Sequence, residues 1–359
     1  VLFYTRDGLA ATASKIATGG TVSQSISGGN SENTIGSMQY RTLGRTQLVV
    51  SIMGFGASPL GDVFGAIDPA EGMRAVHLAI DQGINYFDVS PYYGLTLAEE
   101  RLGRAIEGRR KGVILSTKCG RYGEASFDFS AERIRQSVDE SLRRLRTDYV
   151  DLLQAHDVEF GDVEQIIHET IPEMRRLQQQ GKARYIGITG YPLGTLVRIA
   201  EAVPLDSIIS YCRYNLLVDD MDAVLMPVAK KHGIGVINAS GLHMGVLTEG
   251  GAPSWHPAPA KVREAGSLAA EFCRSRGFDL AELALRFCFD YPLVASTLVG
   301  MSTPDQVRRN LHVLSAPADP EMVQQVRAIL APVFNYVWPS GRRENSDPVR
   351  EETGEPPSR

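Results

Sequence analysis

Ile84-Asn85-Tyr86-Phe87-Asp88-Val89-Ser90-Pro91-Tyr92-Tyr93-Gly94 is the stretch from which the fold can be inferred, because it joins an apolar run to an acid, a proline and two tyrosines. This pattern predicts a short buried strand that delivers a carboxylate and a phenol to one rim of a sheet. Two further apolar runs also end on polar groups, residues 113–118 on Lys118 and residues 149–156 on His156. Each such group alone is more often structural, but four on one rim indicate a functional site.

Strand-like and helix-like segments alternate from residue 39 onward. The predicted strands span residues 50–57, 86–90, 113–118, 149–156, 185–189, 207–212, 235–240 and 295–300, and amphipathic patterns predict helices at residues 70–82, 130–146, 163–180 and 221–232. Alternation of this kind predicts an α/β fold with a parallel sheet, and eight units favour closure into a single-domain (β/α)8 TIM barrel. Residues 250–259 are rich in Gly and Pro and predict a long loop, a candidate lid over the site.

Composition and charge limit the possible partners. The 359 residues are 43% hydrophobic and 22% charged, with a net charge of −5, which describes a globular chain with a large core. The negative charge argues against nucleic acid or an anionic membrane as a main partner, and no apolar run approaches 18 residues, the length of a membrane span. We therefore expect a small-molecule partner, and the oligomeric state stays open.

The four cysteines are far apart in the sequence and form no C-x-x-C pair. They are Cys119, Cys212, Cys273 and Cys288. This spacing is typical of reduced thiols in a cytoplasmic protein rather than of a disulfide framework or a metal site, so we predict no metal.

The ends of the chain differ from its centre. Residues 1–37 are rich in Ser, Thr and Gly and predict a flexible leader, with Met38 as a plausible native start. We expect the barrel to occupy residues 38–341 and residues 342–359 to form a flexible C-terminal tail.

The four polar groups have complementary chemistry. The Lys118 ammonium would stabilise the phenolate of Tyr93 and so favour proton exchange with an alcohol or a carbonyl. Asp88 would hold Lys118 in place, and His156 could orient the same substrate oxygen. None of these groups accepts a hydride, so a redox reaction here requires a bound cofactor.

In order, spacing and strand placement, these four residues resemble the catalytic tetrad of the aldo-keto reductases. Five segments are similar to sugar dehydrogenases of that family: residues 54–61, 117–122, 127–130, 187–190 and 338–341. The resemblance implies that Tyr93 is the general acid/base, that Lys118 and Asp88 tune it, and that His156 positions the sugar hydroxyl. It also implies oxidation of an aldose such as L-galactose or L-fucose at the anomeric carbon to its lactone.

The resemblance further implies which residues contact cofactor and substrate. The cofactor set is Gly56, Ala57, Thr189, Gly190, Tyr211, Ser240, Leu242, Gly245, Gly300, Ser302, Gln306, Arg309 and Asn310, and the substrate set is Tyr92, Arg121, Tyr122 and Trp338. Thr189-Gly190 stands where many relatives have Ser-Asn for the nicotinamide amide. Tyr211 replaces a common glutamine, and Ala239 replaces an aromatic residue that stacks on the nicotinamide, a role that Tyr211 could take.

The same resemblance favours NAD over NADP, although NADP stays possible. NADP-specific relatives use an arginine and a lysine against the 2′-phosphate, and here the aligned positions are Gln306 and Gly300. Arg308 and Arg309 lie one turn further on and could replace them. Thr303-Pro304-Asp305-Gln306 predicts a capping box at a helix start that could face an anion.

Two other functions remain open on sequence alone. One is a broad aldehyde or ketone reductase that uses NADPH. The other is a non-enzymatic barrel subunit that binds cofactor and regulates a partner.

Overall fold

Eight parallel strands close into a barrel, which confirms the predicted fold. The computed structural model describes residues 38–348, so the predicted leader and the end of the predicted tail lie outside it. The strands, in their order around the barrel, are β10 (Ser296–Gly300), β3 (Met53–Gly56), β4 (Tyr86–Asp88), β5 (Ile114–Cys119), β6 (Val150–Ala155), β7 (Ala183–Gly190), β8 (Ser207–Tyr211) and β9 (Gly235–Ala239).

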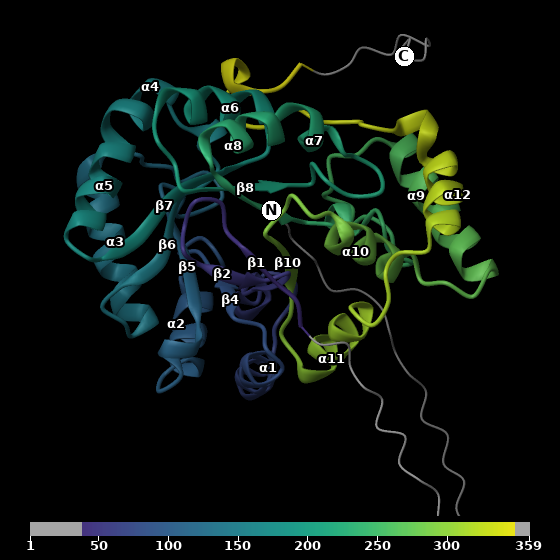
Figure 1. Cartoon of the computed structure of the whole chain (residues 1–359), viewed down its shortest axis with the longest axis horizontal. Coiled ribbons are helices and arrows are strands. Elements are labelled where there is room, and N and C mark those ends of the chain that lie inside the picture. The colour runs from purple at the N-terminus through teal and green to yellow at the C-terminus, as the bar shows by residue number, and fades with distance from the viewer. Residues whose placement is uncertain (1–37, 349–359) are drawn as a thin grey trace, which may run out of the picture.

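Helices surround this barrel (Figure 1). They are α1 (Pro69–Asp81), α2 (Leu97–Ala105), α3 (Ala131–Leu145), α4 (Val163–Gln165), α5 (Ile171–Gln179), α6 (Leu193–Ala202), α7 (Asp220–Val224), α8 (Met226–His232), α9 (Ala260–Ser275), α10 (Leu280–Asp290), α11 (Pro304–Val313) and α12 (Pro320–Leu330). Short 3-10 turns add η1 (Ser58–Gly61), η2 (Arg110–Gly112), η3 (Val158–Phe160), η5 (His243–Gly245), η6 (Ala331–Val333) and η7 (Arg343–Asn345).

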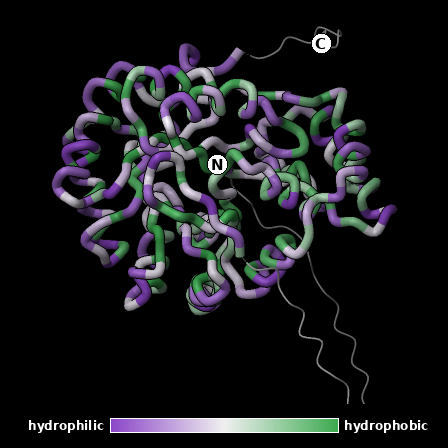
Figure 2. The backbone as a smooth tube through the Cα atoms, in the orientation of Figure 1, coloured by the Kyte–Doolittle hydropathy of each residue, from purple (hydrophilic) through white to green (hydrophobic). Residues whose placement is uncertain are grey.

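The core lies between the strands and the inner faces of the helices. Most apolar residues of the barrel strands are buried, and the helices contribute buried apolar stripes such as Ile134, Val138 and Leu142 on α3. Figure 2 shows the consequence: hydrophobic segments lie in the centre, whereas the outer helices alternate between hydrophobic and hydrophilic residues. Burial of these stripes is the main driving force that holds the helices on the barrel.

The first predicted strand, residues 50–57, was wrong as one element, because the chain turns at Ile52. Its first part belongs to a hairpin of β1 (Tyr40–Thr42) and β2 (Val49–Ser51), and only its second part forms β3. Leu43, Leu48 and Val50 of the hairpin region pack with residues inside the barrel, and the Arg45 amide donates to the carbonyl oxygen of Gly233, just before the start of β9. The hairpin thus closes the end of the barrel opposite the site.

Two predicted helices each contain a proline that changes their hydrogen bonding. Residues 221–232 form α7 and α8, with Pro227 in the first turn of α8. Residues 163–180 form α4 and α5 joined by a π-helical turn, η4 (Ile166–Thr170), with Pro172 in the first turn of α5. A proline lacks the amide that would continue the helical hydrogen bonds. Residues 221–232 therefore form two helices separated at Leu225, whereas residues 163–179 stay helical throughout, as predicted, with a π-helical turn inside.

The ordered chain continues past the predicted boundary at residue 341. Asn345 is buried, and its Nδ2 donates to the carbonyl oxygens of Glu159 and Gly161, each at 2.9 Å. Asp347 accepts the amides of Leu193 and Gly194 at the start of α6. Residues 342–348 therefore belong to the packed unit.

In the part of the chain that the structure describes, no helix has the length and apolar character needed to cross a membrane.

Candidate active site

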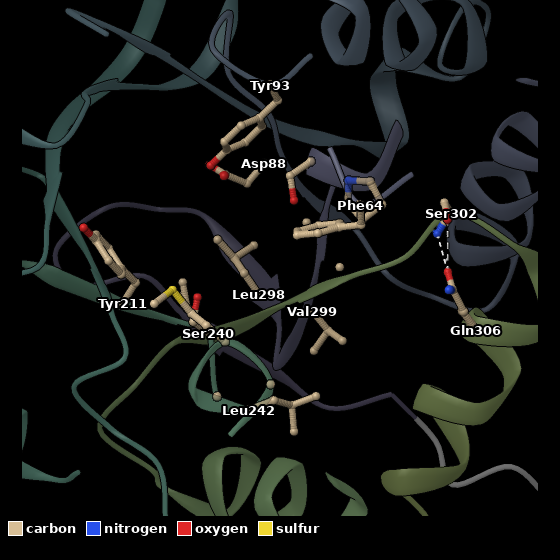
Figure 3. A pocket seen from close by; sticks show the side chains of 18 of the residues that line it. Phe64, Asp88, Tyr93, Tyr211, Ser240, Leu242, Leu298, Val299, Ser302 and Gln306 are labelled. Atoms are coloured by element: carbon tan, nitrogen blue, oxygen red, sulfur yellow. Dashed lines mark hydrogen bonds between the residues drawn. The ribbon is translucent and has the colours of Figure 1, made fainter. Parts of the chain in front are cut away.

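The four predicted catalytic side chains meet at one end of the barrel. Asp88 ends β4, Lys118 lies near the end of β5, His156 directly follows β6, and Tyr93 follows β4 in the loop before α2. All four line a cavity of about 650 Å³ that extends to the N-terminus of α11. Figure 3 shows Tyr93 and Asp88 on one side of this cavity and Ser302 and Gln306 on the other.

Asp88 and Lys118 form a buried ion pair. Their side chains are 4% and 3% exposed, and the Lys118 ammonium contacts Asp88 Oδ1 while also donating to the carbonyl oxygen of Val89 at 3.0 Å. Ser116 Oγ donates to Asp88 Oδ2 at 2.8 Å. Burial lowers the pKa of Lys118, but Asp88 and Tyr93 outweigh that effect and the net pKa is raised. Lys118 is therefore a fixed positive charge at neutral pH.

Tyr93 lies against this charge. The Lys118 Nζ atom is 4.7 Å from the centroid of the Tyr93 ring. Burial raises the pKa of Tyr93 to about 12, and the Lys118 ammonium opposes this only in part. The ammonium acts in the predicted direction, but desolvation is the larger effect, so the phenol keeps its proton near neutral pH in the free protein.

His156 is held as a neutral imidazole. Its Nδ1 is 3.0 Å from Ser90 Oγ, and its ring meets the Tyr93 ring edge-on at 5.8 Å with an interplanar angle of 89°. Burial lowers the pKa of His156 to about 3. The Nε2 of this ring lies 3.6 Å from Asp157 Oδ2, beyond hydrogen-bond distance, so it can bond to a substrate oxygen.

Gly94 allows the loop that carries Tyr93 to close on the barrel. It has φ of +62°, and a Cβ there would lie 2.0 Å from the carbonyl oxygen of Gly61. Only glycine accepts both the left-handed backbone and this close approach. The sequence Tyr92-Tyr93-Gly94 thus fixes the position of the phenol.

The far end of the cavity carries the predicted capping box. Thr303 Oγ1 accepts the amide of Gln306 at 3.3 Å, and Gln306 Oε1 accepts the amide of Ser302 at 2.7 Å and that of Thr303 at 3.3 Å. Figure 3 shows the Gln306 amide directed at Ser302. Three donors near the start of α11 are therefore already satisfied within the protein.

Most residues of the predicted cofactor set line the cavity. They are Gly56, Thr189, Tyr211, Ser240, Leu242, Gly245, Gly300, Ser302 and Gln306. Four others do not line it. Ala57 is fully buried, and its amide donates to the carbonyl oxygen of Asp88. Gly190 lies against Glu159, and Arg309 and Asn310 lie on α11 beyond the cavity wall.

None of the four residues of the predicted substrate set lines the cavity, although Tyr92 and Arg121 lie directly behind it. Arg121 is buried, pairs with Asp157 and lies 4.0 Å from the centroid of the Tyr92 ring. Tyr122 accepts the amide of Gly120 at 3.1 Å. Trp338 stacks on Tyr191, with ring centroids 4.4 Å apart. All four therefore lie outside the cavity lining, and their contact with a substrate stays a prediction.

Sequence reasoning missed two kinds of lining residue. Phe64 comes from the loop between β3 and α1, and Figure 3 shows its ring between the Tyr93 side and the Ser302 side of the cavity. Asp157 lines the cavity beside His156. Two sequence features could have indicated these residues. Phe64 is an apolar residue between Gly61 and Gly65, and Asp157 is an acid next to a histidine at a strand end. Residues 250–259, the candidate lid, are not among the lining residues.

Comparison with known proteins agrees with this geometry. Residues 52–331 match the aldo/keto reductase family. The chain is 47% identical over 319 residues to L-galactose dehydrogenase of Arabidopsis thaliana, covering 86% of this chain and 99% of that protein. It is 32% identical over 295 residues to D-arabinose 1-dehydrogenase of Saccharomyces cerevisiae, covering 74% and 86%.

A solved structure shares this fold. The holo form of aldo-keto reductase AKR11C1 from Bacillus halodurans superposes with a TM-score of 0.71 at 28% identity, covering 86% of this chain and 100% of that chain.

Proposed function

This chain belongs to the aldo/keto reductase family of oxidoreductases, and we propose that it oxidises the anomeric carbon of an aldose such as L-galactose or L-fucose to the lactone, with NAD as the hydride acceptor. The observation that carries this proposal is the convergence of Asp88, Lys118, Tyr93 and His156 on one cavity. Its relatives named L-galactose dehydrogenase and D-arabinose 1-dehydrogenase support an aldose as the substrate.

The residues that line the cavity suit a nicotinamide dinucleotide. The cavity runs from the Tyr93 phenol to the N-terminus of α11, and apolar side chains, among them Leu242, Leu298 and Val299, line its middle. The N-terminus of α11 lies at the far end, and its dipole favours an anionic group such as the pyrophosphate, although the capping box already satisfies the amides of Ser302, Thr303 and Gln306. Tyr211 and Thr189 would contact the nicotinamide half, and Ser240, Leu242 and Ser302 the rest. When bound, this group supplies the hydride acceptor that no side chain here can supply.

The residues of the tetrad handle the proton. His156 donates a hydrogen bond to the anomeric hydroxyl oxygen and orients the C–H bond for hydride departure. Tyr93 takes the hydroxyl proton in its phenolate form, which Lys118 stabilises, and passes it on to solvent. One hydride and one proton leave the aldose, so the carbon becomes the carbonyl of the lactone. In the reverse direction the protonated phenol is the acid.

The start of α11 supports NAD rather than NADP. Gln306 uses its Oε1 to satisfy the amides of Ser302 and Thr303, so these donors are not free for a 2′-phosphate. Asp305 adds an exposed carboxylate in the first turn, and Arg308 pairs with it at 2.7 Å. The 2′-phosphate of NADP would meet a carboxylate and few free donors at this helix start. Comparing kcat/KM for NAD and NADP at a fixed sugar concentration tests this preference.

Following NADH absorbance with a panel of aldoses and simple aldehydes tests the proposed reaction. We expect oxidation of L-galactose or L-fucose with NAD. Activity confined to aldehydes with NADPH would favour a broad reductase, and cofactor binding without turnover would favour a binding subunit.

The location of the protein is a further part of the proposal. All four cysteines are buried free thiols. This supports a reducing compartment such as the cytoplasm.

A further inference from the structure

Glu159 is a buried carboxyl group directly behind the cavity. It lies on η3, which Asp157 begins with a left-handed backbone, and its side chain is fully buried. Its Oε1 accepts the Tyr211 hydroxyl at 3.1 Å, the Ser340 hydroxyl at 3.2 Å and the Tyr191 amide at 3.2 Å. Its Oε2 is buried and has no hydrogen-bond partner among the described residues.

The charges around Glu159 disfavour its ionisation. The nearby acid on the same turn is Asp157, whose carboxylate is paired with Arg121. From other elements, the titratable group that reaches the Glu159 carboxyl is the phenol of Tyr211, at the end of β8. Tyr191, which follows β7, reaches it only with its backbone amide, and its phenol accepts the Trp338 amide. No salt bridge joins Glu159 to a cation in residues 38–348. Burial, and then Asp157, raise the pKa of Glu159 to about 8.

Gly190 leaves space for the second oxygen. A Cβ at that position would lie 2.8 Å from Glu159 Oε2. With three donors on Oε1 and none on Oε2, the proton belongs on Oε2.

Glu159 also connects the cavity wall with the end of the chain. Its carbonyl oxygen accepts the Arg342 amide and Asn345 Nδ2, both at 2.9 Å. Its side chain holds Tyr211, which lines the cavity, and Tyr191, which is 5.4 Å from the Tyr211 ring centroid. Figure 3 shows the Tyr211 hydroxyl directed away from Ser302 and Gln306. Glu159 is thus placed to fix the Tyr211 ring.

We propose that Glu159 is a positioning residue, which acts as a neutral carboxylic acid and holds the Tyr211 ring against the nicotinamide half of the bound cofactor. The inference rests on the proposed function for the identity of the cofactor. Glu159 contacts neither cofactor nor substrate and acts through Tyr211.

The first test measures NADH binding to the full chain by fluorescence titration, without sugar. Glu159→Gln keeps the shape and a neutral acceptor, so it should bind NADH within about twofold of the wild type. Glu159→Ala should bind about tenfold more weakly, which corresponds to the loss of about 1.4 kcal/mol of positioning. In turnover, Glu159→Ala should raise the KM for NAD more than it lowers kcat.

Matched variants keep this test decisive if Glu159→Ala folds poorly. Tyr211→Phe retains the ring but removes its hydroxyl donor, so it should also weaken NADH binding. Ser340→Ala removes a donor to the same oxygen from a residue outside the cavity wall, and it should leave NADH affinity unchanged. Wild-type affinity in Tyr211→Phe, or a Gln variant as weak as the Ala variant, would overturn the proposal.

The second test measures the protonation state through thermal unfolding without cofactor. The unfolded carboxyl ionises near its ordinary pKa of 4.5, whereas the folded one holds its proton to about 8. The stability of the wild type relative to Glu159→Gln should therefore fall as the pH rises from about 5 to 8 and then level off. A difference that stays constant over this range would overturn the neutral assignment. A chain that binds NADH but oxidises no sugar would refute only the proposed reaction.

Discussion

Replacing Tyr93 with phenylalanine should remove the proton transfer and leave the pocket. The phenyl ring can keep the edge-on contact with His156 at 5.8 Å, and Lys118 keeps Asp88 and the carbonyl of Val89 as partners. The change therefore removes one hydroxyl, worth about 1 kcal/mol of folding stability. It also removes the only group placed to exchange the substrate proton, which should lower kcat by about 10²-fold or more, or about 2.7 kcal/mol in the barrier.

The assay compares kcat from NADH absorbance, the dissociation constant of NADH from fluorescence, and the unfolding temperature. Tyr86→Phe is the matched control, because Tyr86 lies on the same strand as Asp88, is fully buried, and does not line the cavity. It should leave kcat unchanged. If Tyr93→Phe retained wild-type kcat, Tyr93 could not be the acid/base. If it lost NADH binding as well, the phenol would have a binding role instead.

Three further outcomes follow from the same geometry. Asp88→Asn leaves the Lys118 ammonium buried beside a neutral amide, so we expect a loss of about 3–5 kcal/mol in urea unfolding, and adding Lys118→Met should restore part of that loss. Because the pKa of Tyr93 is raised to about 12, the kcat/KM for sugar oxidation should rise with pH from 7 to 10, by at most about tenfold per unit; a limb near pH 6.5 would contradict the neutral assignment of His156. Gln306→Arg frees the amides of Ser302 and Thr303, which Gln306 now accepts, and adds a cation, so it should raise kcat/KM with NADP by about tenfold or more relative to NAD. An unchanged ratio would show that residues other than Gln306 discriminate against the 2′-phosphate.

The sequence predicted the barrel and the meeting of the tetrad because both depend on local patterns. Each tetrad residue lies at or just after a strand end. Parallel strands bring these ends to one rim of the barrel regardless of how the helices pack. The hairpin boundary at Ile52 was missed because residues 50–57 form one apolar run, and only pairing with residues 40–42 divides it. The role of Glu159 could not be predicted, because its contact with Ser340 joins residues 181 positions apart.

The buried carboxylates of this site show why function, rather than stability, accounts for its polar residues. An ion pair such as Asp88–Lys118 gives up hydration on both sides, and apolar side chains of similar volume would often stabilise the fold as well or better. Glu159 has no such cation among the described residues and avoids this cost by staying protonated. The two carboxyl groups differ in charge: Asp88 pairs with the Lys118 ammonium beside Tyr93, whereas Glu159 accepts the Tyr211 hydroxyl without a cation beside it in residues 38–348. Exchanging these properties, with a neutral residue at 88 or a permanent charge at 159, should therefore impair proton transfer in the first case and cofactor affinity in the second.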